Sequence, residues 1–189
     1  MGVKGNRSKE NNCALCSWKS KGNMEPGHIA IPDQFIDRTK DRESTFYDQG
    51  TVAHISTADP FCPELRDLAI STGKKLDYDI HEKATQVCIE GPRFSTRAES
   101  NMFRNWGADT INMTLFPECV LARESQICYI AIATITDYDV WAETAVSHHE
   151  VLKTLEKNVE KTNNIIQKII PQINNDRKCL CANALDGAI

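Results

Sequence analysis

Two carboxylates spaced two residues apart, Asp137 and Asp139, first suggest chemistry in this sequence. They follow an apolar, β-branched run from Ile127 to Thr136, which is typical of a strand buried on both faces of a parallel sheet. Because alternate strand residues point to the same side, both acids can face one pocket. There they could accept hydrogen bonds from an amine, or one could donate a proton if burial raised its pKa. The alternative is that they end a strand in a solvated turn, and the spacing leaves both interpretations open.

Two further predicted strands also end in groups that could bind a ligand. Phe94, in the segment EGPRFS at residues 90–95, could offer an apolar face to a flat ring. Met113 could pack against a sugar, since its side chain is flexible and polarizable, and Thr114 adds a hydroxyl. A flat ring, a polyol and an anion together make a nucleoside plus phosphate. Phe94 and Met113 would serve equally as core residues, and Thr114 as an ordinary strand-end hydroxyl.

The elements that must position these groups alternate between strands and helices along the chain. This alternation predicts an α/β fold with a largely parallel or mixed sheet, in which ligands bind beyond the carboxyl ends of the strands. Strands are expected at 28–31, 84–90, 108–114 and 127–136, and helices at 63–76, 96–106, 117–125 and 146–170.

Local signals support two of these helices. Pro63 is well placed as the first residue of a helix, although Gly73 weakens the middle of its apolar pattern. Thr96 and Glu99 have the spacing of a capping box. The charged segment 39–50 is expected to be a surface loop, and the tail from residue 172 contains no predicted element.

The bulk composition describes an ordinary soluble chain. It has 189 residues, a net charge of -4 and 41% hydrophobic residues, which suits one domain and gives no indication of nucleic-acid binding. No apolar run approaches membrane-spanning length, and no secretory signal is recognisable. We therefore expect a cytosolic protein without membrane or nucleic-acid partners.

The eight cysteines suggest no disulfide framework, because that argument applies to short secreted chains. Cys88, Cys119 and Cys128 lie in apolar runs and are expected to be small core residues. Cys13 and Cys16 have the spacing of a metal knuckle, for which Cys179 and Cys181 are the candidate partners. A zinc site is one interpretation of this spacing, and the sequence leaves the role of these four cysteines open.

Six segments, in order and with few gaps, resemble the S-methyl-5'-thioadenosine phosphorylases of the trimeric purine nucleoside phosphorylase family. The resemblance runs from about residue 24 to residue 173. It implies a phosphorylase/hydrolase-like three-layer fold with a mixed central sheet, here incomplete at the amino end. Residues 1–23 would then be a disordered leader and 174–189 a divergent tail. The segments are DQFIDRT at 33–39, EGPRFS at 90–95, RAES at 97–100, WGAD at 106–109, INMT at 111–114 and TDYD at 136–139.

The resemblance implies that phosphate cleaves S-methyl-5'-thioadenosine to adenine and 5-methylthioribose 1-phosphate, with phosphate as co-substrate and no cofactor. Asp137 would bind the purine near N7 and N6 and help to protonate the leaving base, supported by Asp139. Phe94 would stack on the purine, Met113 would line the ribose and Thr114 would touch phosphate. The implied substrate-binding set also includes Ile111, Asn112, Val151 and Leu152.

The resemblance also implies a homotrimer in the cytoplasm and nucleus, in which His54 reaches a neighbouring protomer's 5' pocket. Relatives that prefer 6-oxopurines have Glu in place of Ser95 and Asn in place of Asp137, so this chain is expected to prefer adenine. His148 falls where methylthio enzymes have an apolar residue. If it points inward, the pocket would accept adenosine as well.

Three family segments that hold phosphate have no counterpart in this sequence. They are a Gly-Gly-Thr-Gly loop, an Arg-His pair and a Thr-Ala-Cys-Gly segment. Thr114 alone would then represent the phosphate site, and one hydroxyl cannot hold a dianion as a cationic, backbone-lined pocket does. We therefore expect weak or no phosphorolysis by this chain. The alternative function is an inactive family member that binds adenine nucleosides or associates with full-length subunits.

Overall fold

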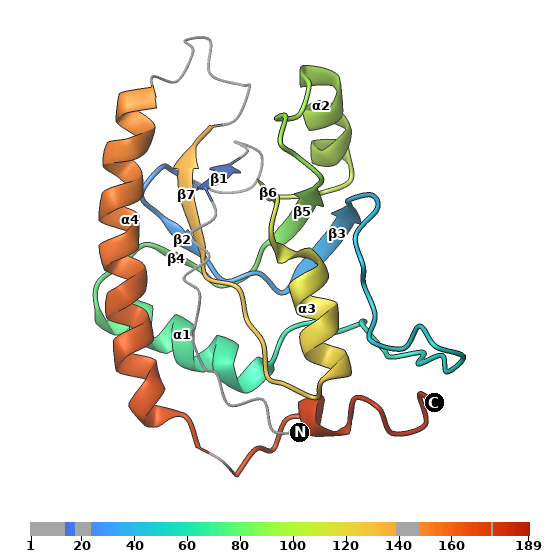
Figure 1. The fold of residues 1–189 in the computed structure, drawn as a ribbon. Helices are drawn as coiled ribbons and strands as arrows, with labels where there is room; N and C mark the ends of the chain where they lie inside the picture. The colour runs from blue at the N-terminus through green and yellow to red at the C-terminus, as the bar shows by residue number, and fades with distance from the viewer. Residues whose placement is uncertain (1–13, 18–23, 139–147, 175) are drawn as a thin grey trace.

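The computed structural model describes residues 14–17, 24–138, 148–174 and 176–189, with only the backbone described for 14–17 and 148–153. The centre of the fold is a mixed seven-stranded sheet in the order β3-β5-β6-β1-β7-β2-β4 (Figure 1). The strands are β1 (Ala14–Ser17), β2 (Ile29–Ala30), β3 (Gln34–Arg38), β4 (Ile80–His81), β5 (Thr85–Ile89), β6 (Thr110–Asn112) and β7 (Ala133–Asp137).

Strand β1 joins the two halves of this sheet. It pairs antiparallel with β6 and parallel with β7, so that Cys16 lies opposite both Ile111 and Asp137. On one side β3, β5 and β6 run parallel. On the other side β2 is antiparallel to β7 and parallel to β4. The expectation of a disordered leader is therefore wrong for residues 14–17, because the sheet recruits these four residues as a central strand.

Helices cover both faces of the sheet and complete three layers, as expected for the α/β class. Helices α1 and α4 pack on each other near β2 and β4, whereas α2 and α3 lie beside β5 and β6 (Figure 1). The α-helices are α1 (Pro63–Lys75), α2 (Arg97–Asn105), α3 (Leu115–Glu124) and α4 (His148–Ile169), and two short 3-10 helices follow, η2 (Ile170–Gln172) and η3 (Leu180–Asn183).

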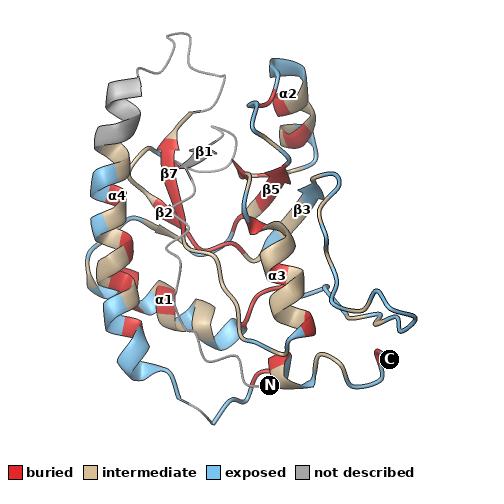
Figure 2. Cartoon of the chain, viewed as in Figure 1, coloured by how far each residue is buried: buried red, intermediate tan, exposed pale blue. Residues whose placement is uncertain are grey.

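Strand β5 shows how alternation separates the layers. Val87 and Ile89 pack with Phe103 of α2 on one face, whereas Cys88 packs with Leu115 of α3 on the other. Successive strand side chains point to opposite faces, so a strand covered on both faces needs an unbroken apolar run. Figure 2 shows this burial along β5 and β7.

The strand expected at 127–136 is shorter in the structure, since β7 begins only at Ala133. Ile127 is 55% exposed, and residues 128–132 are half-buried. Within this segment Ile130 packs toward α1 and α4, while Tyr129 packs toward α3. Neighbouring residues of this segment pack toward helices on opposite sides. The segment therefore has the apolar pattern of a buried strand although it lies outside β7.

Two local predictions are explained at atomic level. The capping box of α2 is formed, because Glu99 N donates to Thr96 Oγ1 at 3.1 Å and Thr96 N donates to Glu99 Oε2 at 2.7 Å. Gly73 is needed for packing, since a Cβ there would lie 2.5 Å from Ile80 Cδ1. Within the described ranges, no helix combines the length and apolar character required to cross a bilayer.

Candidate functional site

The Arg42 side chain hydrogen-bonds to the main chain at the ends of both β5 and β6. Its Nη1 donates to the carbonyl oxygen of Met113 at 2.9 Å, and its Nη2 donates to that of Glu90 at 2.9 Å and that of Ile89 at 3.3 Å. Nη1 also donates to the carbonyl oxygen of Phe116, and Nε pairs with the Glu90 carboxylate at 3.1 Å. One planar guanidinium thus holds the start of the 90–95 loop against the segment after β6.

No sequence pattern indicates this role for Arg42, because the residue lies in the charged segment expected to be a surface loop. Its side chain is only 18% exposed. Its acceptors are mainly main-chain carbonyls 47 to 74 residues away along the chain. Such contacts leave no local signal, since any residue type provides a carbonyl group.

Gly91 and Met113 form a second contact between these strand ends. Gly91 has φ +72°, and a Cβ built on it would lie 2.7 Å from Met113 Sδ. Glycine meets both requirements, because it tolerates positive φ and leaves room for the thioether. The expected sugar-binding methionine therefore lies directly on the loop that carries the expected base-binding residues.

Phe94 and Ser95 differ sharply in exposure. Phe94 is 69% exposed, so its ring face is open to a ligand. Ser95 is buried, and its Oγ has no hydrogen-bond partner among the described residues. A cavity of about 340 Å³, here called the loop cavity, is lined by Ser95, Glu90 and Gly91 together with residues of α2.

Asn112 and Thr114 play different roles at the end of β6. Asn112 is buried, and its Oδ1 accepts hydrogen bonds from Thr114 N at 3.2 Å and Leu115 N at 3.3 Å. It therefore holds the turn into α3. Thr114 is exposed at the N-cap of α3 and makes no side-chain capping bond. Ile111 is a core residue, 5% exposed.

Asp137 lies across β1 from Ile111. Cys16 is paired with both residues, and the register between β1 and β7 shifts between Leu15 and Cys16. Ile111 and Met113 belong to one apolar cluster at the end of β6, and β1 is the strand between β6 and β7. Asp137 is half-buried, and Thr136 Oγ1 donates to its Oδ2 at 2.8 Å.

Other expected site residues lie outside what the structure describes. Asp139 is not described, and His148, Val151 and Leu152 are described only as backbone of α4.

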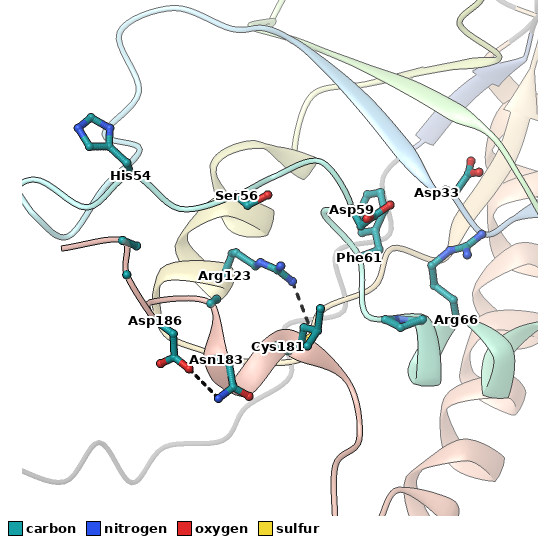
Figure 3. A pocket seen from close by; sticks show the side chains of 15 residues that line it. Asp33, His54, Ser56, Asp59, Phe61, Arg66, Arg123, Cys181, Asn183 and Asp186 are labelled. Atoms are coloured by element: carbon teal, nitrogen blue, oxygen red, sulfur yellow. Dashed lines mark hydrogen bonds between the residues drawn. The ribbon is translucent and has the colours of Figure 1, made fainter.

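His54 lies beside a different cavity. The tail cavity, of about 620 Å³, is lined by His54, by Arg123 of α3 and by residues of the carboxy-terminal segment such as Asp186 (Figure 3). The backbone N–H of His54 donates to the carbonyl oxygen of Ala188 at 2.7 Å. The loop cavity has no lining residue in common with it.

Glu90, in the 90–95 loop, and Glu99, in α2, both accept hydrogen bonds from neighbouring groups. The pKa of Glu90 is lowered, chiefly by the hydrogen bond from the Lys40 backbone N–H and to a smaller extent by Arg42. Arg93, followed by the Thr96 backbone N–H, lowers the pKa of Glu99 to about 2. Both carboxyls are ionised at neutral pH, so they anchor the loop and are poor proton donors.

The site is thus built from the ends of β5, β6 and β7 in a three-layer α/β fold, and comparison with known proteins gives its class. A sequence model described as "Phosphorylase superfamily" matches residues 21–171. The chain belongs to this superfamily.

The relatives are more specific. The chain is 56% identical over 168 residues to the S-methyl-5'-thioadenosine phosphorylase of Nitrosopumilus maritimus, covering 89% of this chain and 64% of the relative. It matches the crystal structure of a methylthioadenosine phosphorylase from an antarctic soil metagenomic library with TM-score 0.85 and 44% identity, covering 93% and 62% of the two chains.

A further match is a mutant of adenosine/methylthioadenosine phosphorylase from Schistosoma mansoni in complex with methylthioadenosine, with TM-score 0.79 and 32% identity. That match covers 87% of this chain and 64% of the other. The chain spans less than two thirds of the length of each of these relatives.

Proposed function

We propose that the protein belongs to the methylthioadenosine-specific branch of its superfamily and acts in phosphorolysis of S-methyl-5'-thioadenosine to adenine and 5-methylthioribose 1-phosphate. The observation that carries the proposal is that Asp137 ends β7 and Met113 follows β6, the two strands that flank β1, with Met113 packed on Gly91 of the 90–95 loop. The names of the similar proteins support the same substrate.

The chemistry of the residues fits an adenine nucleoside. A carboxylate accepts hydrogen bonds, so Asp137 suits the 6-amino group of adenine better than a 6-oxo group. Positive charge develops on the sugar as the base leaves, and protonation of the base by Asp137 would aid its departure. The exposed Phe94 ring offers a stacking face, and the Thr114 hydroxyl could donate a hydrogen bond to phosphate.

The test measures nucleoside binding and cleavage separately. Calorimetry gives the affinity for S-methyl-5'-thioadenosine, and chromatography follows phosphate-dependent release of adenine. We expect Asp137→Asn to weaken binding by about tenfold or more, because the amide presents a donor to the 6-amino group. Asp79→Asn is the matched control, since the Asp79 side chain is 71% exposed. Equal affinity of the wild type and the Asp137 variant would contradict the proposal.

A second candidate is nucleoside binding with little or no cleavage by this chain. It is favoured because two arginines beside the 90–95 loop, Arg42 and Arg93, are already engaged; Arg38 and Lys40 also line the loop cavity. Arg42 donates to main-chain carbonyls, and Arg93 forms a two-point ion pair with Glu99 at 2.7 Å. Neither is free to bind a phosphate dianion. Tight nucleoside binding without adenine release would establish this candidate, and rapid release would exclude it.

Adenosine is a further possible substrate, as the name of the Schistosoma mansoni relative suggests. If His148 faces the 5' position, His148→Val should lower kcat/KM, or affinity if turnover is absent, for adenosine relative to the methylthio substrate. His149→Val is the matched control on the same helix. An unchanged ratio in both variants would exclude His148 as the selecting residue.

We further propose that the protein acts as a homotrimer, with His54 contributing to a neighbour's 5' pocket. The separation of His54 from the loop cavity supports this arrangement. Light scattering coupled to size exclusion should give three chains per particle. A monomer that binds nucleoside with full affinity would contradict it.

A further inference from the structure

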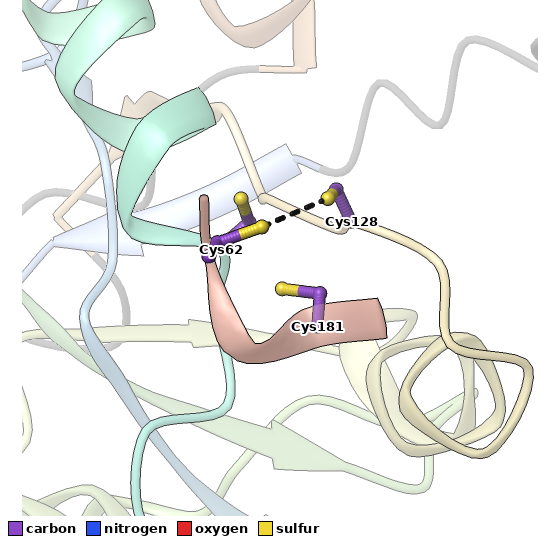
Figure 4. Close-up of side chains that lie close together, drawn as sticks. Cys62, Cys128 and Cys181 are labelled. Atoms are coloured by element: carbon purple, nitrogen blue, oxygen red, sulfur yellow. Dashed lines mark hydrogen bonds between the residues drawn. The ribbon is translucent and has the colours of Figure 1, made fainter. Parts of the chain in front are cut away.

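Four cysteines from three separate segments meet at the base of α1. Cys62 is the N-cap residue of α1, Cys128 precedes β7, and Cys179 and Cys181 flank the start of η3. Their sulfur atoms all lie within 4.8 Å of one another, and Cys128 Sγ is 3.4 Å from Cys179 Sγ. Figure 4 shows the labelled side chains of Cys62, Cys128 and Cys181 turned toward a common centre.

This grouping differs from the one suggested by spacing. Spacing favours Cys13 and Cys16 as the partners of Cys179 and Cys181, but the side chains of Cys13 and Cys16 lie outside the described residues. The structure gives Cys179 and Cys181 two other neighbours, Cys62 and Cys128. Cys128 is thus more than the plain core residue expected from its apolar surroundings.

We propose that Cys62, Cys128, Cys179 and Cys181 form a structural zinc site. Tetrahedral zinc with Zn–S bonds of about 2.3 Å requires sulfurs about 3.8 Å apart. The sulfurs are separated by at most 4.8 Å, so the longest edge would contract by at most about 1 Å. Four cysteines around one point are a closed donor set, and zinc prefers such a set in structural sites.

The charge around the cluster suits a bound metal. Four thiols lose four protons to solvent as four Zn–S bonds form, which leaves the site with a net charge of about −2. Arg177 Nη1 lies 3.9 Å from Cys128 Sγ, and Arg123 Nη1 lies 3.9 Å from Cys181 Sγ (Figure 3). Both guanidiniums donate toward sulfur, as the outer partners of a thiolate site should.

The metal would fix the carboxy-terminal segment, which is otherwise held by a few polar contacts. Lys178 N donates to Glu64 Oε1 at 2.8 Å, and His54 N donates to the carbonyl oxygen of Ala188. Cys181 itself lines the tail cavity, as does His54. Zinc would therefore hold one wall of this cavity, a role separate from cleavage of a nucleoside.

The first test measures metal content in the whole 189-residue chain, purified with a reductant and without an affinity tag. Plasma mass spectrometry should find one zinc per chain that survives dialysis. Replacement by Co²⁺ should produce the thiolate-to-cobalt charge-transfer band and the visible spectrum of a tetrahedral site. Absence of bound metal after incubation with zinc, with the four thiols still titratable, would overturn the proposal.

The second test separates this site from other cysteines. Cys128→Ser and Cys181→Ser should each weaken zinc binding by about tenfold or more, whereas Cys119→Ser, buried outside the cluster, should retain one zinc. If a variant fails to fold, the zinc content and cobalt spectrum of the unaltered chain still decide. Disulfides among the four residues in the reduced preparation, seen as a loss of two hydrogens per bridge, would also overturn the proposal.

Discussion

The guanidinium of Arg42 donates to the carbonyl oxygen of Met113 at 2.9 Å, and this bond fixes where β6 ends relative to β5. The same side chain reaches the carbonyls of Ile89 and Glu90. Recognition of a base by the 90–95 loop and of a sugar by Met113 would therefore depend on Arg42, which hydrogen-bonds to the main chain of both segments.

Replacement of Arg42 by lysine should disturb both strand ends. An ammonium group cannot reach several carbonyls in a fixed plane, so buried acceptors would lose their partners. We expect the free energy of unfolding to fall by about 2–4 kcal/mol, measured by urea denaturation. Arg38→Lys is the matched control, because Arg38 is exposed and lies over the Trp106 ring; it should cost less than about 1 kcal/mol. Equal losses would show that Arg42 is an ordinary surface residue.

Gly91→Ala should be more damaging than Gly27→Ala. Both glycines have positive φ, +72° and +96°, but only the first would place a Cβ against Met113. Backbone strain alone should cost about 1–2 kcal/mol at either position, and displacement of the Met113 side chain should add about 1–2 kcal/mol at Gly91.

Thermal or urea unfolding of both variants measures the difference. The double variant Gly91→Ala, Met113→Ala should recover the added part, since the obstructing thioether is removed. If the two glycine variants lose equal stability, the Met113 contact is unimportant.

The capping box of α2 should make part of the folding stability depend on pH. The folded-state pKa of Glu99 is about 2, below its ordinary value of 4.5, chiefly because of Arg93. A depressed carboxyl pKa stabilises the fold above the ordinary value, and this stabilisation disappears as the pH falls from 4.5 toward 2.

The stability difference between wild type and Glu99→Gln should therefore shrink between about pH 6 and about pH 2, as measured by urea midpoints. Thr96→Ala should cost about 1 kcal/mol at neutral pH, because it removes an N-cap acceptor. A difference that stays constant with pH would contradict the assigned role of Glu99.

The elements with local signals could be predicted from the sequence. Pro63 marks the first residue of α1, and Thr96 with Glu99 marks the start of α2, as the structure confirms. The α/β class was also correct, because strands and helices alternate along the chain. The family could be proposed because six segments of the sequence resemble motifs of one family, and the expected substrate is what that resemblance implies.

The remainder depends on contacts between distant segments. Arg42 binds main-chain carbonyls, and four cysteines from positions 62 to 181 meet in space. Neither set of contacts produces a repeating pattern of residues in the sequence. The end of β7 was predicted to within one residue, but its beginning was placed too early, because residues packed between helices can alternate like a strand. The roles assigned to Asp139 and His148 stay predictions.

The place of β1 has a consequence for protein engineering. Neighbouring strands lie about 4.8 Å apart, so this one strand separates β6 from β7 by about 10 Å. It therefore acts as a spacer between the residues after β6 and Asp137 at the end of β7. An expression variant that begins at Met24 would lose this spacer and expose two unpaired strand edges, which would favour aggregation. Designs that trim or tag this protein should leave residues 14–17 intact.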